Sequence, residues 1–330
     1  ALYCALMFSV EKPFELFSCT LVPEGVTMPL DVFSGMLVHD SFSIYVRALL
    51  LLFVAMFAVF TQITGTPVRD TAGEFYVLIL GAVLGMCLMV SANHMLMVFL
   101  GFEMASVPSY ALAGFLKHRR ASGEAALKYA VFGAGAAGVM LYGISLLVGT
   151  LGSAHLPTMA LQLADLIQSN PGGDRTMVLL LGGLMVMVGM AFKLSAVPFH
   201  FWAPDVFEGA TAEVAAFLSI ASKAAAIALL VRLTFGLGYL ETTLSAALDP
   251  ARHYMVGLIG LLAVITCTFG NLAAYGQTNM KRLLAYSTIA HAGYMMLAVA
   301  AAVELLGQPV TGPIQAQWAV AAIGFYLAIY

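Results

Sequence analysis

The sequence predicts an all-α membrane protein that crosses the lipid bilayer many times. Hydrophobic residues make up 62% of the 330-residue chain and charged residues only 9%, and the mean hydropathy is +0.95. Soluble domains are roughly half apolar and about a quarter charged, so this composition excludes that class. Apolar stretches long enough to cross the hydrocarbon core, about 20 residues each, recur along the chain. The net charge of −3 gives no indication of a nucleic-acid partner.

Complete membrane spans can be placed in order by this length criterion. They are expected near 43–62, 75–93, 95–116, 125–150, 176–207, 212–236, 254–276 and 282–303. Partial spans at 1–10 and from residue 315 indicate that both ends of a longer protein are missing. The polar segment 11–42 is expected to form a short surface hairpin, and 152–175 a loop with a short surface helix.

The orientation in the membrane follows from the distribution of Lys and Arg, because cytoplasmic loops are enriched in them. One side holds six basic residues, namely Arg69, those of "KHRR" at 117–120, Lys281 and Arg282. The other side holds four, namely Lys12, Arg47, Arg175 and Arg252. The first side is therefore expected to face the cytoplasm.

Four charged residues fall inside or near the ends of the expected spans without an obvious way for the side chain to reach the surface: Glu103, Lys128, Lys193 and Lys223. Each would cost at least about 2.5–3.5 kcal/mol at the centre of the bilayer, so these side chains should face protein, water or one another. A lysine suits a proton relay because desolvation disfavours its charged form and a nearby carboxylate favours it. This reading is favoured for Lys193 and Lys223. Lys128 fits a side chain that reaches the surface equally well, and Glu103 fits half of a structural ion pair.

The stretch "MAFKLSAVPFHFW" at 190–202 predicts a discontinuous helix. Pro198 removes one backbone hydrogen bond and clashes with the preceding turn, which frees the carbonyl of Leu194. Broken helices line polar cavities in ion-coupled transporters, although a simple proline kink is the alternative. His200 lies seven residues after Lys193, so it is expected on the same helix face. It would there be either a proton carrier or a packing residue.

Several other kinds of site are excluded by spacing and context. The four cysteines, Cys4, Cys19, Cys87 and Cys267, are scattered, which argues against disulfides and against cysteine-bound metals or clusters. The "GAGAAG" at 133–138 lies within a span and not between a strand and a helix, so it is not a dinucleotide fingerprint. Its small residues four apart, 133/137 and 134/138, instead favour close helix packing. The chain thus offers no ligand set for a metal or cofactor.

Five stretches together resemble a known family. They are "FEMASVPSYALAGF" (102–115), "EAALKYAVFGAGAAGVMLYGISLLVGTLG" (124–152), "FKLSAVPFHFWAPDVFEGA" (192–210), "FLSIASKAAAIALLVR" (217–232) and "KRLLAYSTIAHAGYMML" (281–297). They resemble the N-type antiporter-like membrane subunits of proton-pumping NADH–quinone oxidoreductase, respiratory complex I. The resemblance covers the chain from about residue 35 to its end.

The resemblance implies an antiporter-like bundle of two five-helix repeats with inverted topology, each with a broken helix. Residues 75–236 would form the first repeat, which carries a proton half-channel, and 237–330 the start of the second. Residues 1–74 would supply a partial span, the surface hairpin segment and a peripheral span. The second broken helix and its terminal lysine would lie beyond Tyr330.

The resemblance also implies roles for individual residues. Glu103 matches the carboxylate of the first repeat, Lys193 the broken-helix lysine, and Lys223 the lysine that connects the two repeats. Lys128 and His200 match further polar residues along the proton path.

The implied function is proton translocation by a subunit that carries out no redox chemistry of its own. NADH, FMN, iron–sulfur clusters and quinone would be bound elsewhere in the complex. The partners would be neighbouring antiporter-like membrane subunits and the lipid bilayer of a bacterial cell membrane, with an organellar membrane as the alternative. Two other functions remain open. One is a subunit of a cation/proton antiporter or membrane-bound hydrogenase, and the other is a membrane scaffold with inert buried charges.

Overall fold

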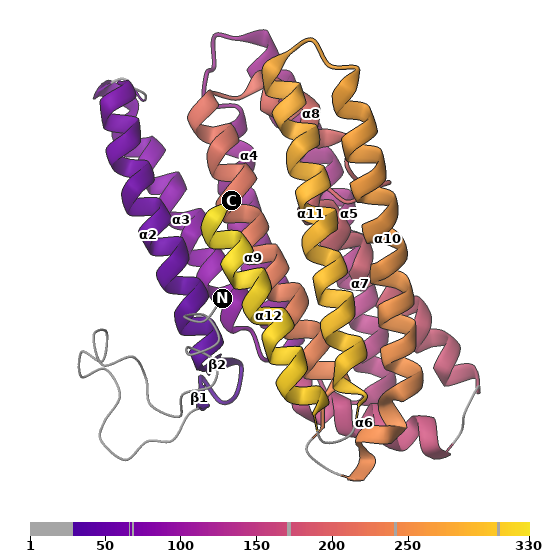
Figure 1. Cartoon of the computed structure of the whole chain (residues 1–330). Coiled ribbons are helices and arrows are strands. Elements are labelled where there is room, and N and C mark those ends of the chain that lie inside the picture. Colours follow the sequence, from indigo (N-terminus) through magenta and orange to yellow (C-terminus); the bar gives the residue numbers. More distant parts are fainter. Residues whose placement is uncertain (1–28, 66, 68, 170–172, 241–242, 309–310) are drawn as a thin grey trace.

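The structure is a computed structural model that describes residues 29–330 except 66, 68, 170–172, 241–242 and 309–310. The expected partial span at 1–10 and most of the segment 11–42 lie outside the described residues. In the described part, long helices run side by side in a single bundle (Figure 1). Nine of these described helices are long and apolar enough to cross a membrane.

The helices follow one another along the chain with short connections. They are α2 (Ser41–Thr64), α3 (Ala72–Ser91), α4 (Met95–Ala113), α5 (Arg120–Leu151), α6 (Leu156–Ser169), α7 (Asp174–Leu194), α8 (Trp202–Gly209), α9 (Ala212–Gly238), α10 (Asp249–Tyr275), α11 (Met280–Leu306) and α12 (Gly312–Ile329). Short 3₁₀ turns at Arg69–Thr71 and Thr243–Leu248 precede α3 and α10. Strands β1 (Leu30–Val32) and β2 (Leu37–His39) form an antiparallel hairpin.

The sequence-based prediction of an all-α polytopic protein is confirmed, since every expected complete span contains a helix. The expected surface hairpin is present as β1 and β2, and the expected surface helix at 152–175 is α6. The partial span from residue 315 corresponds to α12. The one expected span at 176–207 is divided into α7 and α8, as a discontinuous helix requires.

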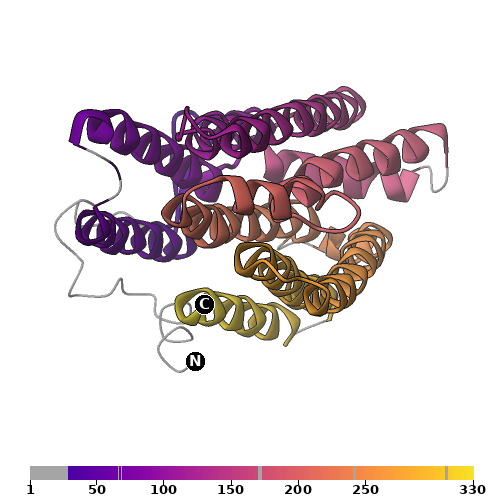
Figure 2. The ribbon, with the colours of Figure 1, turned by 90° about the horizontal axis from the view of Figure 1, so that it is seen from above.

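Helix α9 forms the centre of the bundle. Seen from above, it lies between α3, α4 and α5 on one side and α11 and α12 on the other (Figure 2). It contacts helices of both groups as well as α2, α6 and α7. Nearly all of its side chains from Val214 to Leu233 are therefore buried. Its sequence is apolar on every face, which is the pattern expected of a helix surrounded by protein.

The two ends of the bundle can be told apart by the elements that lie there. The α8 side holds α8 and the loop with "KHRR", and we expect it to face the cytoplasm. The α6 side holds α6 and the β hairpin. These two names are used below.

On the α6 side an ion pair joins α2 and α3 to α9. Asp40 caps α2 by accepting from the backbone of Ser43 at 2.8 Å, and it accepts from both terminal nitrogens of Arg232 at 2.6 and 2.9 Å. Arg232 also donates to the carbonyl of Val90 at the end of α3. Burial by itself raises the pKa of Asp40, but the hydrogen bonds and charge of Arg232, together with Ser43, hold it below the usual value.

Two helix pairs share the same close approach. A Cβ at Gly85 of α3 would lie 2.4 Å from the backbone nitrogen of Ala105 in α4. A Cβ at Gly270 of α10 would lie 2.7 Å from the backbone nitrogen of Ala290 in α11. The two contacting residues are 20 positions apart in the sequence in both pairs. The directions are inverted, since α3 runs toward the α6 side and α4 returns, whereas α10 runs toward the α8 side and α11 returns. This match supports the predicted inverted repeats at 75–236 and 237–330, which remain a prediction.

The close approach at Gly85 gives a test of the packing. Gly85→Ala should destabilise the protein by about 1–3 kcal/mol, because the added methyl must push α4 away. The matched control is Gly135→Ala on α5, where nothing lies within 4 Å of the added carbon. That change should be neutral or stabilise by up to about 1 kcal/mol through helix propensity. Thermal unfolding of the two purified variants measures the difference, and equal stability would contradict the packing described.

Candidate functional site

The site is centred on the ammonium group of Lys193, which lies in the last turn of α7. The residue is only 1% exposed. Its Nζ donates to the hydroxyl of Ser106 on α4 at 2.7 Å and lies 5.1 Å from the centre of the Phe102 ring. The C-terminal end of a helix carries a partial negative charge, which favours a cation there. These three interactions stabilise a charge that the bilayer would otherwise exclude.

The helix break that places Lys193 begins earlier than expected. Ser195 adopts a left-handed conformation (φ 58°) and ends α7, so Pro198 lies in the connecting segment and not within a helix. The expectation that Pro198 frees the carbonyl of Leu194 inside a continuous helix is therefore wrong. The Val197–Pro198 peptide bond in this segment is cis. The predicted discontinuity itself is confirmed.

The polar backbone at the break has partners from other elements. The indole nitrogen of Trp202 donates to the carbonyl of Phe192 at 3.1 Å. The backbone nitrogen of Val197 donates to the hydroxyl of Thr266 on α10 at 3.0 Å. Non-helical backbone at membrane depth requires such partners, because lipid supplies none. The Trp202 ring also stacks on Tyr129 with centroids 4.2 Å apart, which fixes α8 against α5.

Glu103 lies one turn before Ser106 on α4 and interacts with Lys193 through charge. It is half-buried, and within the described residues its Oε1 is buried without a hydrogen-bond partner. Lys193 donates its hydrogen bond to Ser106 and not to the carboxylate. Lys193 thus contacts α4 one turn away from Glu103, and the two interact through charge without a hydrogen bond between them in the described part of the chain.

Lys223 lies near the middle of α9 and is 2% exposed. Within the described part of the chain its Nζ is buried and has no hydrogen-bond partner. A positive charge on Lys223 repels a positive charge on His291 of α11, so the two groups would not carry a proton at the same time. A buried ammonium without a partner is costly, and nearby groups that can exchange a proton with it are therefore of functional interest.

His291 belongs to a polar group that sequence reasoning missed. Its Nδ1 is hydrogen-bonded to the hydroxyl of Tyr326, and its ring lies 4.6 Å from that of Tyr330. The hydroxyls of Tyr330 and Ser219 are 3.3 Å apart, and Ser219 lies one turn before Lys223. The sequence did offer one signal for His291, because it is a titratable residue inside the expected span 282–303. A single histidine in a helix is most often a packing residue, so this signal alone does not predict a functional role.

Lys128 lies away from this centre, at the α8 side. Its side chain is 37% exposed and pairs with Asp205 at 2.7 Å and Glu124 at 2.8 Å. Asp205 also binds Arg282, which in turn binds Glu208. This cluster connects α5, α8 and α11. Of the two interpretations made from sequence, the structure agrees with a side chain that reaches the surface.

His200 lies beyond the helix break. The expectation that it shares a helix face with Lys193 is wrong, since residues 195–201 are not helical and the spacing rule does not apply. Its ring packs 4.6 Å from that of Phe269 on α10. Among the described residues its Nδ1 is buried without a partner. The structure brings it to the break but shows no contact with Lys193.

The small residues of "GAGAAG" serve packing on one face of α5. Gly133 makes room for the hydroxyl of Tyr110, to which an added Cβ would approach within 2.1 Å. Ala137 is also buried, whereas Ala134 and Gly138 face outward. The first of the two expected small-residue pairs is therefore at a packing contact and the second is on the surface of the chain.

Comparison with known proteins places these features in a family. Residues 92–308 match the family described as NADH:quinone oxidoreductase/Mrp antiporter, TM. Among curated relatives, NADH-quinone oxidoreductase subunit N 2 of Chloroherpeton thalassium is 38% identical over 92% of this chain and 55% of its own length. Subunit N of Nitrosomonas europaea is 40% identical over 88% of this chain and 57% of its length. The chain spans about half the length of these relatives.

Solved structures give the same picture. A chain of respiratory complex I from Thermus thermophilus superposes with a TM-score of 0.66 and 37% identity, covering 91% of this chain and 56% of that one. A chain of the Mrp complex from Dietzia sp. superposes with a TM-score of 0.66 over 88% of this chain and 48% of that one. At 22% identity it shows a shared fold alone.

The bond between Trp202 and the carbonyl of Phe192 can be tested by substitution. Trp202→Phe keeps the stacking on Tyr129 and should cost about 1 kcal/mol through the lost hydrogen bond. Trp202→Ala removes the buried ring as well and should cost about 3–5 kcal/mol. The unfolding temperature of the purified protein measures both. A loss as large in the Phe variant as in the Ala variant would show that the hydrogen bond and not the ring holds α8.

Proposed function

The chain belongs to the NADH:quinone oxidoreductase/Mrp antiporter family of membrane proteins, and we propose that it moves protons as an N-type subunit of an NADH–quinone oxidoreductase. The observation that carries the proposal is Lys193, a buried ammonium at a helix break that is bonded to Ser106, one turn from the carboxyl group of Glu103. A charge in this position is too costly to be kept without a purpose or a partner. Lysine and glutamate side chains can both take up and release a proton.

The first step of the proposed relay is the loading of Lys193. A negative charge at Glu103 favours the protonated lysine, and loss or withdrawal of that charge favours proton release. Ser106 accepts from the protonated Nζ while its own hydroxyl donates to the carbonyl of Phe102, so the oxygen is oriented to hold the ammonium in place. Lys193 thereby responds to changes that originate at Glu103.

The second step is transfer from α7 toward the second half of the molecule. Lys223 on the central helix has no competing partner among the described residues, so its neutral amine is free to take up a proton and its ammonium form to pass one on. His291, Tyr326 and Tyr330 continue the polar groups from α9 to α11 and α12. Histidine exchanges protons near neutral pH, which suits a position after the lysine.

Protons would enter from the α8 side. There the Lys128–Asp205–Arg282 cluster joins the half-helix α8 to α5 and α11. Lys128 would then act at the entrance and His200 beside the break. Both assignments follow the family resemblance and the position of these residues at this side of Lys193.

The driving force would come from other subunits. We assign the redox cofactors NADH, FMN, iron–sulfur clusters and quinone to the wider complex, and to this chain a translocating role without redox chemistry. Its partners would be neighbouring antiporter-like subunits in a bacterial cell membrane. The names of the relatives and the complex I match support this assignment.

One alternative has specific support. The Mrp complex of Dietzia sp. shares the fold, so cation/proton exchange without a redox partner is the second candidate. The 37% identity to the complex I chain, against 22% to the Mrp chain, favours the redox-driven assignment. Sodium-dependent proton movement without NADH, in membranes that hold the assembled protein, would favour the antiporter.

The pair at the break gives the main test. Lys193→Ala and Glu103→Gln should each leave assembly intact and strongly reduce proton pumping coupled to NADH oxidation, because the charge that is loaded or its modulator is gone. Pumping is followed with a ΔpH-sensitive dye in inverted membrane vesicles. The controls are Lys117→Ala and Glu74→Gln, which change exposed residues at the α8 side. Wild-type pumping in Lys193→Ala would overturn the relay, and failed assembly in both variants would favour a scaffold.

The second step has a separate test. Lys223→Ala should reduce pumping strongly, and His291→Asn should reduce it several-fold, because the proton path is interrupted beyond α9. His253→Asn is the control, since His253 is exposed at the α6 side. If His291→Asn pumps normally while Lys223→Ala does not, the proposed path through His291 is wrong, and the path within this chain ends at Lys223.

A further inference from the structure

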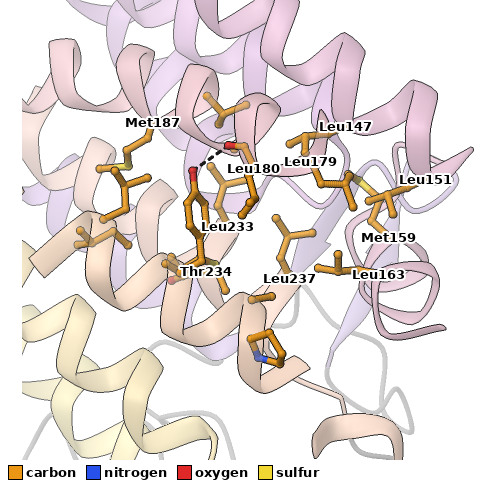
Figure 3. A pocket seen from close by; sticks show the side chains of 18 of the residues that line it. Leu147, Leu151, Met159, Leu163, Leu179, Leu180, Met187, Leu233, Thr234 and Leu237 are labelled. Carbon is orange, nitrogen blue, oxygen red and sulfur yellow. Dashed lines mark hydrogen bonds between the residues drawn. The ribbon is translucent and has the colours of Figure 1, made fainter. Parts of the chain in front are cut away.

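An apolar cavity lies on the α6 side of Lys193, away from the polar groups of the relay. Its volume is about 260 Å³, and its walls come from α5, α6, α7, α9 and α10, with Met95 at the start of α4. Figure 3 shows leucine and methionine side chains from these elements pointing into it, including Leu147, Leu163, Met187 and Leu233. It extends from the surface helix α6 to Met190, one turn before Lys193.

Two of the three polar side chains in the wall, Thr234 and Tyr254, are bonded to the protein itself. The hydroxyl of Thr234 donates to carbonyls of its own helix. The hydroxyl of Tyr254 donates to the carbonyl of Leu180 at 2.8 Å, which joins α10 to α7 (Figure 3). A buried water needs two to four polar partners, and an apolar cavity of about 150 Å³ is already known to stay dry and bind small hydrocarbons. The chemistry of this cavity therefore fits a hydrocarbon ligand.

The position of the cavity indicates where that hydrocarbon comes from. Leu180 and Gly183 line it, while Leu181 and Leu184 on the same helix are exposed on the outer apolar face of the bundle. Helix α7 thus lies between the cavity and the surface that lipid would cover. Tyr254 of α10 packs against α7 here, and its ring would lie 3.4 Å from a Cβ added at Gly183.

The mouth at the α6 side has the features of a headgroup site. The hydroxyl of Thr176 lines the cavity and, within the described residues, is buried without a hydrogen-bond partner. The next residue toward the chain start, Arg175, is exposed and positively charged. Asp174 is exposed beside it, so the start of α7, next to Thr176, carries both charges. A phosphate can pair with the guanidinium and accept from the hydroxyl.

We propose that one acyl chain of a phospholipid from the α6-side leaflet occupies this cavity, with its phosphate near Arg175 and Thr176. The chain packs against Leu163 of α6 and Leu233 of α9 and reaches Met190 below the helix break. Lipid becomes part of the core that supports α7. This site is independent of the proton relay, since it uses none of the relay residues.

Photo-crosslinking tests the proposal in the assembled complex. The probe is a phosphatidylglycerol with a diazirine at mid-chain, incorporated into membranes, with crosslinked residues mapped by mass spectrometry. Leu230 and Leu233 of α9 are 2% and 6% exposed, so a lipid chain reaches them only through the cavity. We expect crosslinks at these two residues but not at Ile227, which is equally buried on α9 and does not line the cavity. Absence of crosslinks at Leu230 and Leu233 would overturn the proposal.

A variant whose side chain fills the cavity can be compared with one that makes the same change on the outer surface. Leu179→Phe places a larger side chain in the cavity and should reduce crosslinking at Leu233 several-fold. Leu184→Phe makes the same change on the outer face of α7 and should leave it unchanged. Equal labelling in both variants would contradict entry through the cavity. A quinone that carries the diazirine in its isoprenoid tail is the second probe, and stronger labelling by it would overturn a phospholipid as the occupant.

Discussion

The structure depends on keeping the ammonium group of Lys193 inside a bundle that is itself surrounded by hydrocarbon. Transfer of an ion into such an environment is opposed by several kcal/mol or more, and this cost falls only where polar groups and opposite charge are near. The end of α7, the hydroxyl of Ser106 and the ring of Phe102 provide this locally. The carboxylate of Glu103, one turn before Ser106 on α4, interacts with Lys193 through charge. The break in the helix is thus part of the charge site, because it creates the helix end at which the lysine lies.

The break in turn imposes requirements on the elements around it. Its backbone needs hydrogen-bond partners within the protein, and Trp202 and Thr266 supply them from α8 and α10. Helix α9 carries the second ammonium, Lys223, through the middle of the bundle, where contacts on all sides exclude lipid. At the α6 side the Asp40–Arg232 pair fixes this central helix to α2 and α3. At the α8 side Asp205 and Arg282 connect the half-helix to α11.

Sequence reasoning located the costly charges because a lysine in an apolar stretch is visible without a structure. It also found the discontinuous helix, since a proline within a span is a local signal. It failed where the outcome depended on three-dimensional placement. The face of His200 could not be predicted once the helix broke before it, and Asp205, one of the two partners of Lys128, comes from a segment distant in sequence. The cavity beneath Lys193 had no signal at all, because Leu and Met side chains that line a cavity look the same in sequence as those that fill a core.

The central claim is that Lys193 and Lys223 are joined by groups that can carry a proton. The most direct measurement is an electron cryo-microscopy map of the assembled complex at a resolution that shows ordered water. We expect water molecules to connect Nζ of Lys193 with Nζ of Lys223, and further water near His291, while the cavity toward α6 contains none. Closely packed apolar side chains between the two lysines, without water, would contradict the account.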